Sequence, residues 1–416
     1  MSAAHLDHRG RPRVAVTGMG VKTPAGTDLE TFWTNLRAGK ATAGEIQAFD
    51  ASAEPVHIAS EVRDFDPIPY FGAKEVRRQD RVSQLGFAAA ADALADAGEI
   101  GADPARSAVI AATGIGGLHT LEINCETYFE RGASRVSPFF VPMMMPNATA
   151  GVISMHFGWT GPAICVATAC AAGSNAIGEG VRLIRDGTSD VVVAGGTEFP
   201  ITRITLAAFA RMGALSANPD PLLASRPFDV HRDGFVIAEG AAFLILEPLD
   251  RALARGARIY GEVTGYGRNA DAYHITAPSP GGVGAATCMH LAIDDAGLTP
   301  GDIGHINAHG TSTELNDAGE AQAIHKVFGD DAPPVTSSKG VLGHMIAGAG
   351  AAEAVVSLLS IRDGIVCPTA NFERASDDIN LDIVAGSPRT IGSRPVLSNS
   401  FGFGGHNATL VLTASA

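Results

Sequence analysis

The chain has 416 residues, of which 46% are hydrophobic and 18% are charged, a composition typical of a globular protein with a large core. Its formal net charge is −14 and no basic stripe is visible, so nucleic acid and anionic membrane surfaces are excluded as expected partners. The length predicts two domains or one duplicated domain.

We expect no targeting or membrane segment. The first residues, MSAAHLDHRGRPR, lack an apolar signal-peptide core, and no stretch reaches the roughly 18 uninterrupted apolar residues of a membrane helix. The five cysteines form no CxxC pair and do not cluster with histidines at metal-ligand spacing. The sequence therefore predicts a cytoplasmic protein with no disulfide and no bound metal ion.

Strand-like apolar runs alternate with Ala-rich helical stretches, which predicts an α/β fold with buried strands. The apolar runs of the first half cover residues 13–20, 107–117, 190–198 and 241–249. Its clearest helical stretch covers residues 84–98. Glycines gather after the strands, so we expect loops at strand ends to hold the functional site. The basic run KEVRRQDR at 74–81 suits an acidic protein partner, although such runs are more often a solvated helix face.

Residues 166–180, VATACAAGSNAIGEG, place Cys170 at a predicted junction of strand, tight turn and helix. Free N–H groups and the positive end of the helix dipole favour an anion there, so we expect this thiol to ionise more readily than a cysteine in solution. The position suits a nucleophile. On this stretch alone, a small residue in a tight helix–sheet contact explains Cys170 equally well.

The second half of the chain repeats features of the first. RVAVTGMG is similar to the later RIYGEVTGYG, and the tetrapeptide Ile-Arg-Asp-Gly occurs at 184–187 and again at 361–364. These echoes predict a gene duplication with a boundary near 250–257. The segment equivalent to the cysteine-bearing helix start is then GHMIAGAG at 343–350, which places His344 near the pseudo-symmetric position of the cysteine.

Three further stretches have catalytic character: INAHGTSTELND, TSSKGVLGHMIAGAGAAE and LSNSFGFGGHNATL. Read singly, His309 in the small-residue loop of the first stretch is more often a structural histidine than a catalyst. Together with TACAAGSNAIG, the motifs resemble in order and separation those of the β-ketoacyl-acyl-carrier-protein synthases, the elongating condensing enzymes of fatty acid and type II polyketide synthesis. The resemblance covers nearly the whole chain.

This resemblance implies an α/β thiolase fold, with duplicated halves in a five-layer αβαβα arrangement. Residues 1–255 would form the half that carries the cysteine, and residues 256–416 the half that carries both histidines and a gating loop. The implied activity is that of an acyltransferase, which condenses malonyl-acyl-carrier protein with an acyl chain bound to cysteine. The implied partner is an acyl carrier protein with phosphopantetheine-linked acyl and malonyl groups. No cofactor is expected, because loss of carbon dioxide drives the formation of the carbon bond.

The same resemblance assigns roles to particular residues. Cys170 is the nucleophile, and His309 and His344 stabilise the enolate oxygen. Lys339 sets the electrostatics, and the backbone N–H groups of Cys170 and Phe403 form a second oxyanion hole. The other residues implied at the substrate site are Thr311 and Thr313 on the phosphopantetheine arm, Ile115 in the acyl channel, Phe139 or Phe140 reaching the partner subunit's channel, Phe401 in the gating loop, and Glu353, which organises the same loops.

Two pathways stay open. TGIGGL and VSPFFVP resemble the fatty acid type, which works as a homodimer. TSTELND departs from the usual fatty acid form, in which Pro and Gly occupy the positions of Glu314 and Asn316, and it resembles the catalytic subunit of a type II polyketide synthase for reduced or polyene chains. Such a subunit forms a heterodimer with a ketosynthase-like chain-length factor.

Three other members of the same fold class fit less well. A non-catalytic chain-length scaffold lacks the active cysteine, which is present here as Cys170. A thiolase needs a second cysteine in its last glycine loop, which reads SFGFGGHN in this chain. An initiating synthase has asparagine where this chain has His344.

Overall fold

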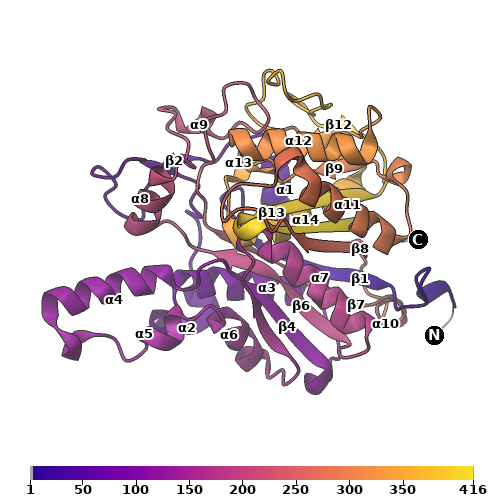
Figure 1. The fold of residues 1–416 in the computed structure, drawn as a ribbon. Helices are drawn as coiled ribbons and strands as arrows, with labels where there is room; N and C mark the ends of the chain where they lie inside the picture. Colours follow the sequence, from indigo (N-terminus) through magenta and orange to yellow (C-terminus); the bar gives the residue numbers. More distant parts are fainter. Residues whose placement is uncertain (1–2, 416) are drawn as a thin grey trace.

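The structure is a computed structural model and describes residues 3–415 (Figure 1). The strands are β1 Val14–Lys22, β2 Gly44–Glu45, β3 Ile58–Ala59, β4 Ser107–Ala112, β5 Ala163–Val166, β6 Val191–Glu198, β7 Gly240–Pro248, β8 Gly261–Ala270, β9 His305–Asn307, β10 Val335–Thr336, β11 Ile365–Val366, β12 Arg389–Thr390, β13 Val396–Gly402 and β14 His406–Thr413. The α-helices are α1 Leu29–Arg37, α2 Ile68–Glu75, α3 Arg81–Ala97, α4 Leu118–Arg131, α5 Phe140–Met144, α6 Ala148–Phe157, α7 Ala172–Arg185, α8 Arg203–Arg211, α9 Pro221–Ala224, α10 Leu249–Ala254, α11 Val283–Ala296, α12 Glu314–Phe328, α13 Lys339–Leu342 and α14 Ala349–Asp363.

The main sheet is built from two halves with the same topology. Its ten strands have the order β10-β9-β13-β14-β8-β1-β7-β6-β4-β5. When the strands of each half are numbered along the chain, both halves read third, second, fourth, fifth, first from the outer edge to the centre. The halves meet where β1 pairs with β8, with Ala15 opposite Glu262 and Val16 opposite Gly261. The duplication that the sequence predicts is therefore present in the strand order.

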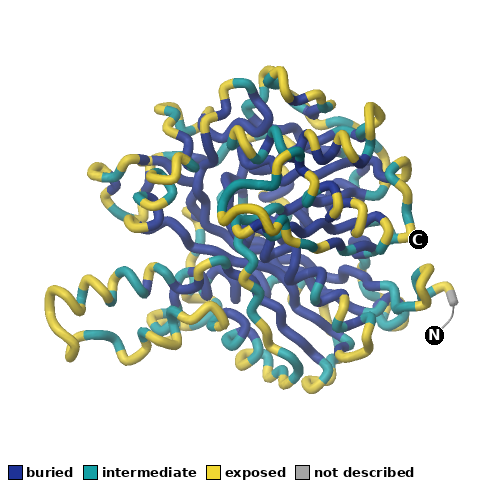
Figure 2. The backbone as a smooth tube through the Cα atoms, viewed as in Figure 1, coloured by how far each residue is buried: buried dark blue, intermediate teal, exposed yellow. Residues whose placement is uncertain are grey.

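Helices cover the outer faces of both halves of the sheet, and two further helices lie between the halves. Helices α7 and α14 contact each other and contact strands of both halves, among them β6, β7 and β14. On one outer face α3 packs on β1, β6 and β7, and on the other α11 packs on β8 and β14 and contacts α12. The result is the five-layer αβαβα arrangement, with the strands and the central helices buried (Figure 2).

The two central helices begin in the same way. Each follows a single 3-10 turn, η5 (Ala169–Ala171) before α7 and η8 (Ile346–Gly348) before α14. The first residue of each turn has a left-handed backbone, with φ of 49° at Ala169 and 46° at Ile346, which non-glycine residues seldom adopt. The repeated tetrapeptide ends α7 and α14 alike. Cys170 and His344 therefore lie beside equivalent turns.

An arm of chain stands away from the body. Helices α4 and α5 form it (Figure 1), and Thr120 is the one buried residue of α4. The edge strand β5 leaves Ile164 45% exposed. Among the described residues, no helix is long and apolar enough to cross a membrane.

The basic run at 74–81 is divided between two environments. Lys74 and Arg77 are exposed. Arg81 instead donates to the buried carboxylate of Glu239 at 2.5 Å. The interpretation of the whole run as one solvated face was therefore wrong for Arg81, because α3 turns that residue into the body.

Candidate active site

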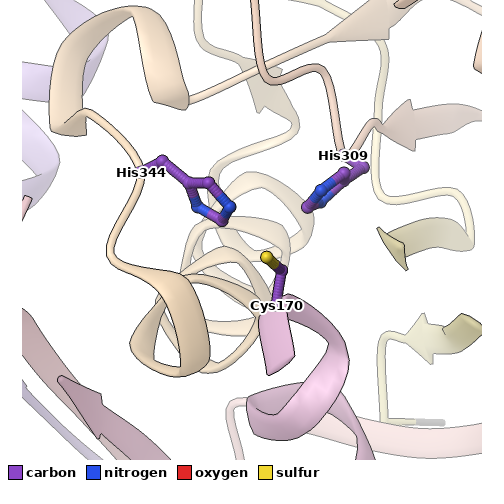
Figure 3. Close-up of side chains that lie close together, drawn as sticks. All are labelled: Cys170, His309 and His344. Atoms are coloured by element: carbon purple, nitrogen blue, oxygen red, sulfur yellow. The ribbon is translucent and has the colours of Figure 1, made fainter. Parts of the chain in front are cut away.

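Three side chains from three separate junctions meet at one point. Cys170 comes from η5 before α7, His309 from the loop after β9, and His344 from the turn after α13. Each offers one sulfur or nitrogen atom, and these atoms lie within 4.8 Å of one another. The thiol lies between the two imidazole rings (Figure 3). Spacing along the chain does not report this convergence, whereas the resemblance stated above had already named these three residues together.

The Cys170 thiol is harder to ionise than the sequence suggests. Burial raises its pKa to about 11, although the charge of Lys339 and the backbone N–H groups of Phe403 and of Cys170 itself act in the opposite direction. The prediction of an acidic thiol was therefore wrong for the free protein, since desolvation outweighs the start of the helix. At neutral pH the thiol keeps its proton, which must leave when the sulfur attacks.

Both histidines are neutral at physiological pH. Burial, and then the positive charge of Lys339, hold the pKa of His309 and of His344 well below its usual value. The two ring centroids are 5.5 Å apart at an interplanar angle of 82°. Phe235 packs against the ring of His344, with centroids 5.1 Å apart, and Phe401 packs against that of His309 at 5.9 Å. Packing thus fixes the orientation of both imidazoles.

Lys339 connects the two histidine segments through a buried ion pair. Its Nζ donates to the backbone oxygen of His309 at 2.6 Å and lies 3.4 Å from Nδ1 of the same residue. It also pairs with the carboxylate of Glu353 on α14. Burial raises the pKa of Glu353 to about 7, against the lowering effect of the Lys339 charge. These bonds hold Lys339 against the backbone and ring of His309 and against the carboxylate of Glu353, within the buried interior of the protein.

A cavity of about 740 Å³ leads to the three side chains. The predicted residues that line it are Cys170, His309, His344, Thr311, Thr313, Phe401 and Phe403. The hydroxyls of Thr311 and Thr313 are 2.9 Å apart and lie at one side of this cavity. The structure therefore brings the predicted nucleophile, both histidines and the predicted arm-binding residues to one cavity.

Besides Lys339, four predicted residues lie outside this lining. Glu353 is behind Lys339, as its ion pair requires. Ile115 is 38% exposed and Phe139 is 39% exposed, and the guanidinium of Arg78 lies 4.8 Å from the Phe139 ring centroid. Phe140 begins α5 in the protruding arm. Within a single chain, Phe139 and Phe140 do not line the cavity.

Two buried glutamates were missed by the sequence reasoning. Glu320 on α12 accepts the backbone N–H groups of His309 at 2.9 Å and Gly310 at 2.8 Å. Glu198, the last residue of β6, accepts the Thr113 hydroxyl at 2.7 Å and the Gly114 N–H at 2.6 Å. Burial raises the pKa of each to about 7. The position of Glu198 at the end of a buried strand was a usable signal, whereas Glu320 reads as an ordinary helix carboxylate.

Comparison with known families identifies the class to which this fold and site belong. Residues 11–252 match the N-terminal domain of β-ketoacyl synthases, and residues 260–373 match their C-terminal domain. These matches assign the fold to a condensing enzyme of the acyltransferase type. The chain belongs to the β-ketoacyl synthase family.

Relatives cover nearly the full length of the chain. The 3-oxoacyl-[acyl-carrier-protein] synthase 2 of Synechocystis sp. is 46% identical over 407 residues, which is 96% of this chain and 97% of the relative. The enzyme of the same name from Staphylococcus aureus is 44% identical over 405 residues, with 96% and 97% covered. Among solved structures, the ishigamide ketosynthase/chain length factor has a TM-score of 0.92 at 36% identity and covers 98% of this chain and 100% of its own. A β-ketoacyl synthase from Burkholderia phymatum has a TM-score of 0.91 at 33% identity, with 97% and 100% covered.

Proposed function

We propose that this protein elongates acyl chains by decarboxylative condensation of malonyl-acyl-carrier protein with an acyl group held on Cys170. The observation that carries the proposal is the position of the thiol between His309 and His344 at the end of the cavity. Its relatives named 3-oxoacyl-[acyl-carrier-protein] synthase 2 support the same reaction. The reaction needs no cofactor, and all five cysteines are free, which suits a reducing cytoplasm.

The first half-reaction is a thioester exchange. The sulfur of Cys170 attacks the carbonyl carbon of the acyl group on the phosphopantetheine arm, and the bond from that carbon to the pantetheine sulfur breaks. The proton lost by Cys170 ends on the departing pantetheine sulfur, so the exchange is balanced. The backbone N–H groups of Phe403 and Cys170 lower the pKa of the thiol, and we expect them to stabilise the oxyanion that forms.

The second half-reaction forms the carbon bond. The malonyl group loses carbon dioxide, and the electron pair of the broken bond enters an enolate whose oxygen can accept hydrogen bonds from His309 and His344. The lysine 3.4 Å from Nδ1 of His309 favours a ring proton on the other nitrogen, which makes this neutral imidazole a donor. The carbanion then attacks the acyl carbon on Cys170, the sulfur departs and takes up a proton, and β-ketoacyl-carrier protein is released.

We infer that the carrier docks beside the arm. Lys74 and Arg77 are exposed there on a chain whose net charge is −14, so they give an acidic carrier a local site of opposite charge. Replacing both with glutamate should raise the KM for acyl carrier protein at least tenfold and leave kcat nearly unchanged. Charge reversal at exposed Arg37 and Lys40, at the end of α1, is the matched control and should leave the KM nearly unchanged. An unchanged KM in the variant of Lys74 and Arg77 contradicts this docking site.

We infer that two ketosynthase chains pair through the edge strand β5. Its exposed Ile164 and unpaired edge, together with exposed Phe129 and Val141 of the arm, are suited to contact with a second chain. Such pairing lets Phe139 or Phe140 reach the acyl channel of the partner subunit. Ile164→Arg should convert a dimer into monomers in light scattering after size-exclusion chromatography. Retention of the dimer contradicts the interface.

A second candidate is the catalytic subunit of a type II polyketide synthase that works with a chain-length factor. It is favoured by Glu314 and Asn316 at the positions of Pro and Gly in the fatty acid type, and by the likeness to the ishigamide ketosynthase/chain length factor. The discriminating experiment incubates the purified chain with saturated acyl and malonyl carrier proteins and records intact masses. Elongation by the chain alone supports the homodimeric fatty acid enzyme, whereas elongation only after addition of a second ketosynthase-like chain supports the polyketide subunit.

A further inference from the structure

The catalytic cluster has the composition of a zinc site. Cys170, His309 and His344 are a thiol and two imidazoles, each buried, with donor atoms within 4.8 Å of one another. Zinc with nitrogen at about 2.0 Å and sulfur at about 2.3 Å in a tetrahedron separates its donors by about 3.4–3.6 Å. A contraction of about 1 Å would therefore give three protein ligands and one open position, the pattern of a catalytic zinc.

The arrangement of these groups does not protect the site from a metal ion. Neutral imidazole binds metals, and a coordinating metal deprotonates a thiol outright. The donor atoms of both rings lie within 4.8 Å of the Cys170 sulfur. Something else must keep the nucleophile available.

Lys339 lies directly behind this cluster. Its Nζ is 3.4 Å from Nδ1 of His309 and is held in place by the backbone oxygen of His309 at 2.6 Å and by Glu353. A donor at Nδ1 needs this nitrogen unprotonated, so the ring proton of His309 is on Nε2. Nε2 is the nitrogen that a metal would bind, and while it carries the proton its lone pair is not available. Lys339 also brings a positive charge to within 3.4 Å of a ring nitrogen of the cluster. The field of this charge opposes a dication at the centre of the cluster.

We propose that Lys339 keeps soft divalent cations such as zinc out of the Cys170–His309–His344 cluster, so that the thiol stays available for acylation. Metal exclusion depends on these side chains alone. Its benefit for catalysis rests on the proposed function, in which Cys170 must carry an acyl group. Lys339 is in this respect a positioning residue that acts through the ring of His309 and through its charge.

The test is a cobalt(II) titration, because cobalt replaces zinc in such sites and a sulfur–cobalt bond gives a near-ultraviolet charge-transfer band. The chains to compare are the wild type, Lys339→Met, and Lys339→Met combined with Glu353→Gln. The double variant removes the buried pair as a unit and so avoids an unpaired buried carboxylate. Thermal unfolding of each variant checks the fold.

We expect the wild type to give no band at one equivalent of cobalt, and both variants to gain a 1:1 band with affinity at least tenfold tighter. Adding Cys170→Ser should remove the band, whereas Cys125→Ser, at an exposed cysteine of α4, should leave it unchanged. A wild type that binds cobalt as tightly as the variants overturns the proposal, as does a folded variant without a Cys170-dependent band. Acylation of wild-type Cys170 is measured separately, so a failure of the proposed function is distinguished from a failure of metal exclusion.

Discussion

Removing the Glu320 carboxylate should loosen the His309 loop and weaken condensation. Glu320 accepts the N–H groups of His309 and Gly310 and the amide of Asn399 at 3.1 Å. Glu320→Gln keeps one acceptor oxygen but turns an amide NH₂ toward the other donors, so at least one buried N–H loses its partner. An unsatisfied buried donor costs about 1–3 kcal/mol, and we expect the free energy of unfolding to fall by that amount.

The assay compares urea unfolding and turnover at pH 8, where the carboxylate of the wild type is ionised because burial places the pKa of Glu320 at about 7. Condensation should fall at least tenfold, and acylation of Cys170 should fall less, because Glu320 holds the histidine segment and not the cysteine turn. Glu99→Gln, at an exposed position, is the matched control and should change neither quantity. Wild-type stability and turnover in Glu320→Gln would refute this account of the loop.

Two further predictions concern the core around the site. A Cβ at Gly173 would lie 2.4 Å from the backbone oxygen of Ala347, so Gly173→Ala should separate α7 from the turn before α14 and destabilise the protein by about 1–3 kcal/mol in chemical denaturation; an unchanged midpoint contradicts this packing. Burial raises the pKa of Glu198 from 4.5 to about 7, so its folded form holds an extra proton between these values. The stabilisation that this proton gives to the folded state is complete below pH 4.5 and is lost as the pH rises through 7. Between pH 5 and pH 8 the wild type should therefore lose up to about 3 kcal/mol of unfolding free energy relative to Glu198→Gln. A stability difference that does not depend on pH refutes the assignment.

The fold could be predicted further than the details of the site. The alternating apolar runs correspond to β1, β4, β6 and β7, and the two Ile-Arg-Asp-Gly tetrapeptides end α7 and α14. These features depend on local periodicity and on repetition, which the sequence carries directly. The motifs around Cys170, His309 and His344 also stand out, because their residue types and order suit one chemistry.

Quantities set by burial could not be predicted in the same way. The sequence places Cys170 at a helix start, but only the packed structure shows that desolvation raises its pKa to about 11. Glu320 reads as a helix carboxylate, and its partners lie in a loop and a strand that the chain reaches from other directions. The pairing of Phe139 or Phe140 with a partner subunit depends on a second chain, and it stays a prediction.

Peptide mass spectrometry after incubation with a saturated acyl carrier protein identifies the residue that accepts the acyl group. We predict that the acyl mass appears on the peptide that contains Cys170, although this thiol is buried, and not on the peptide of the exposed Cys125. Addition of malonyl carrier protein should then discharge that peptide and give the elongated β-ketoacyl carrier. An acyl mass on Cys125 and none on Cys170, or a Cys170→Ala variant that still elongates, would contradict the account.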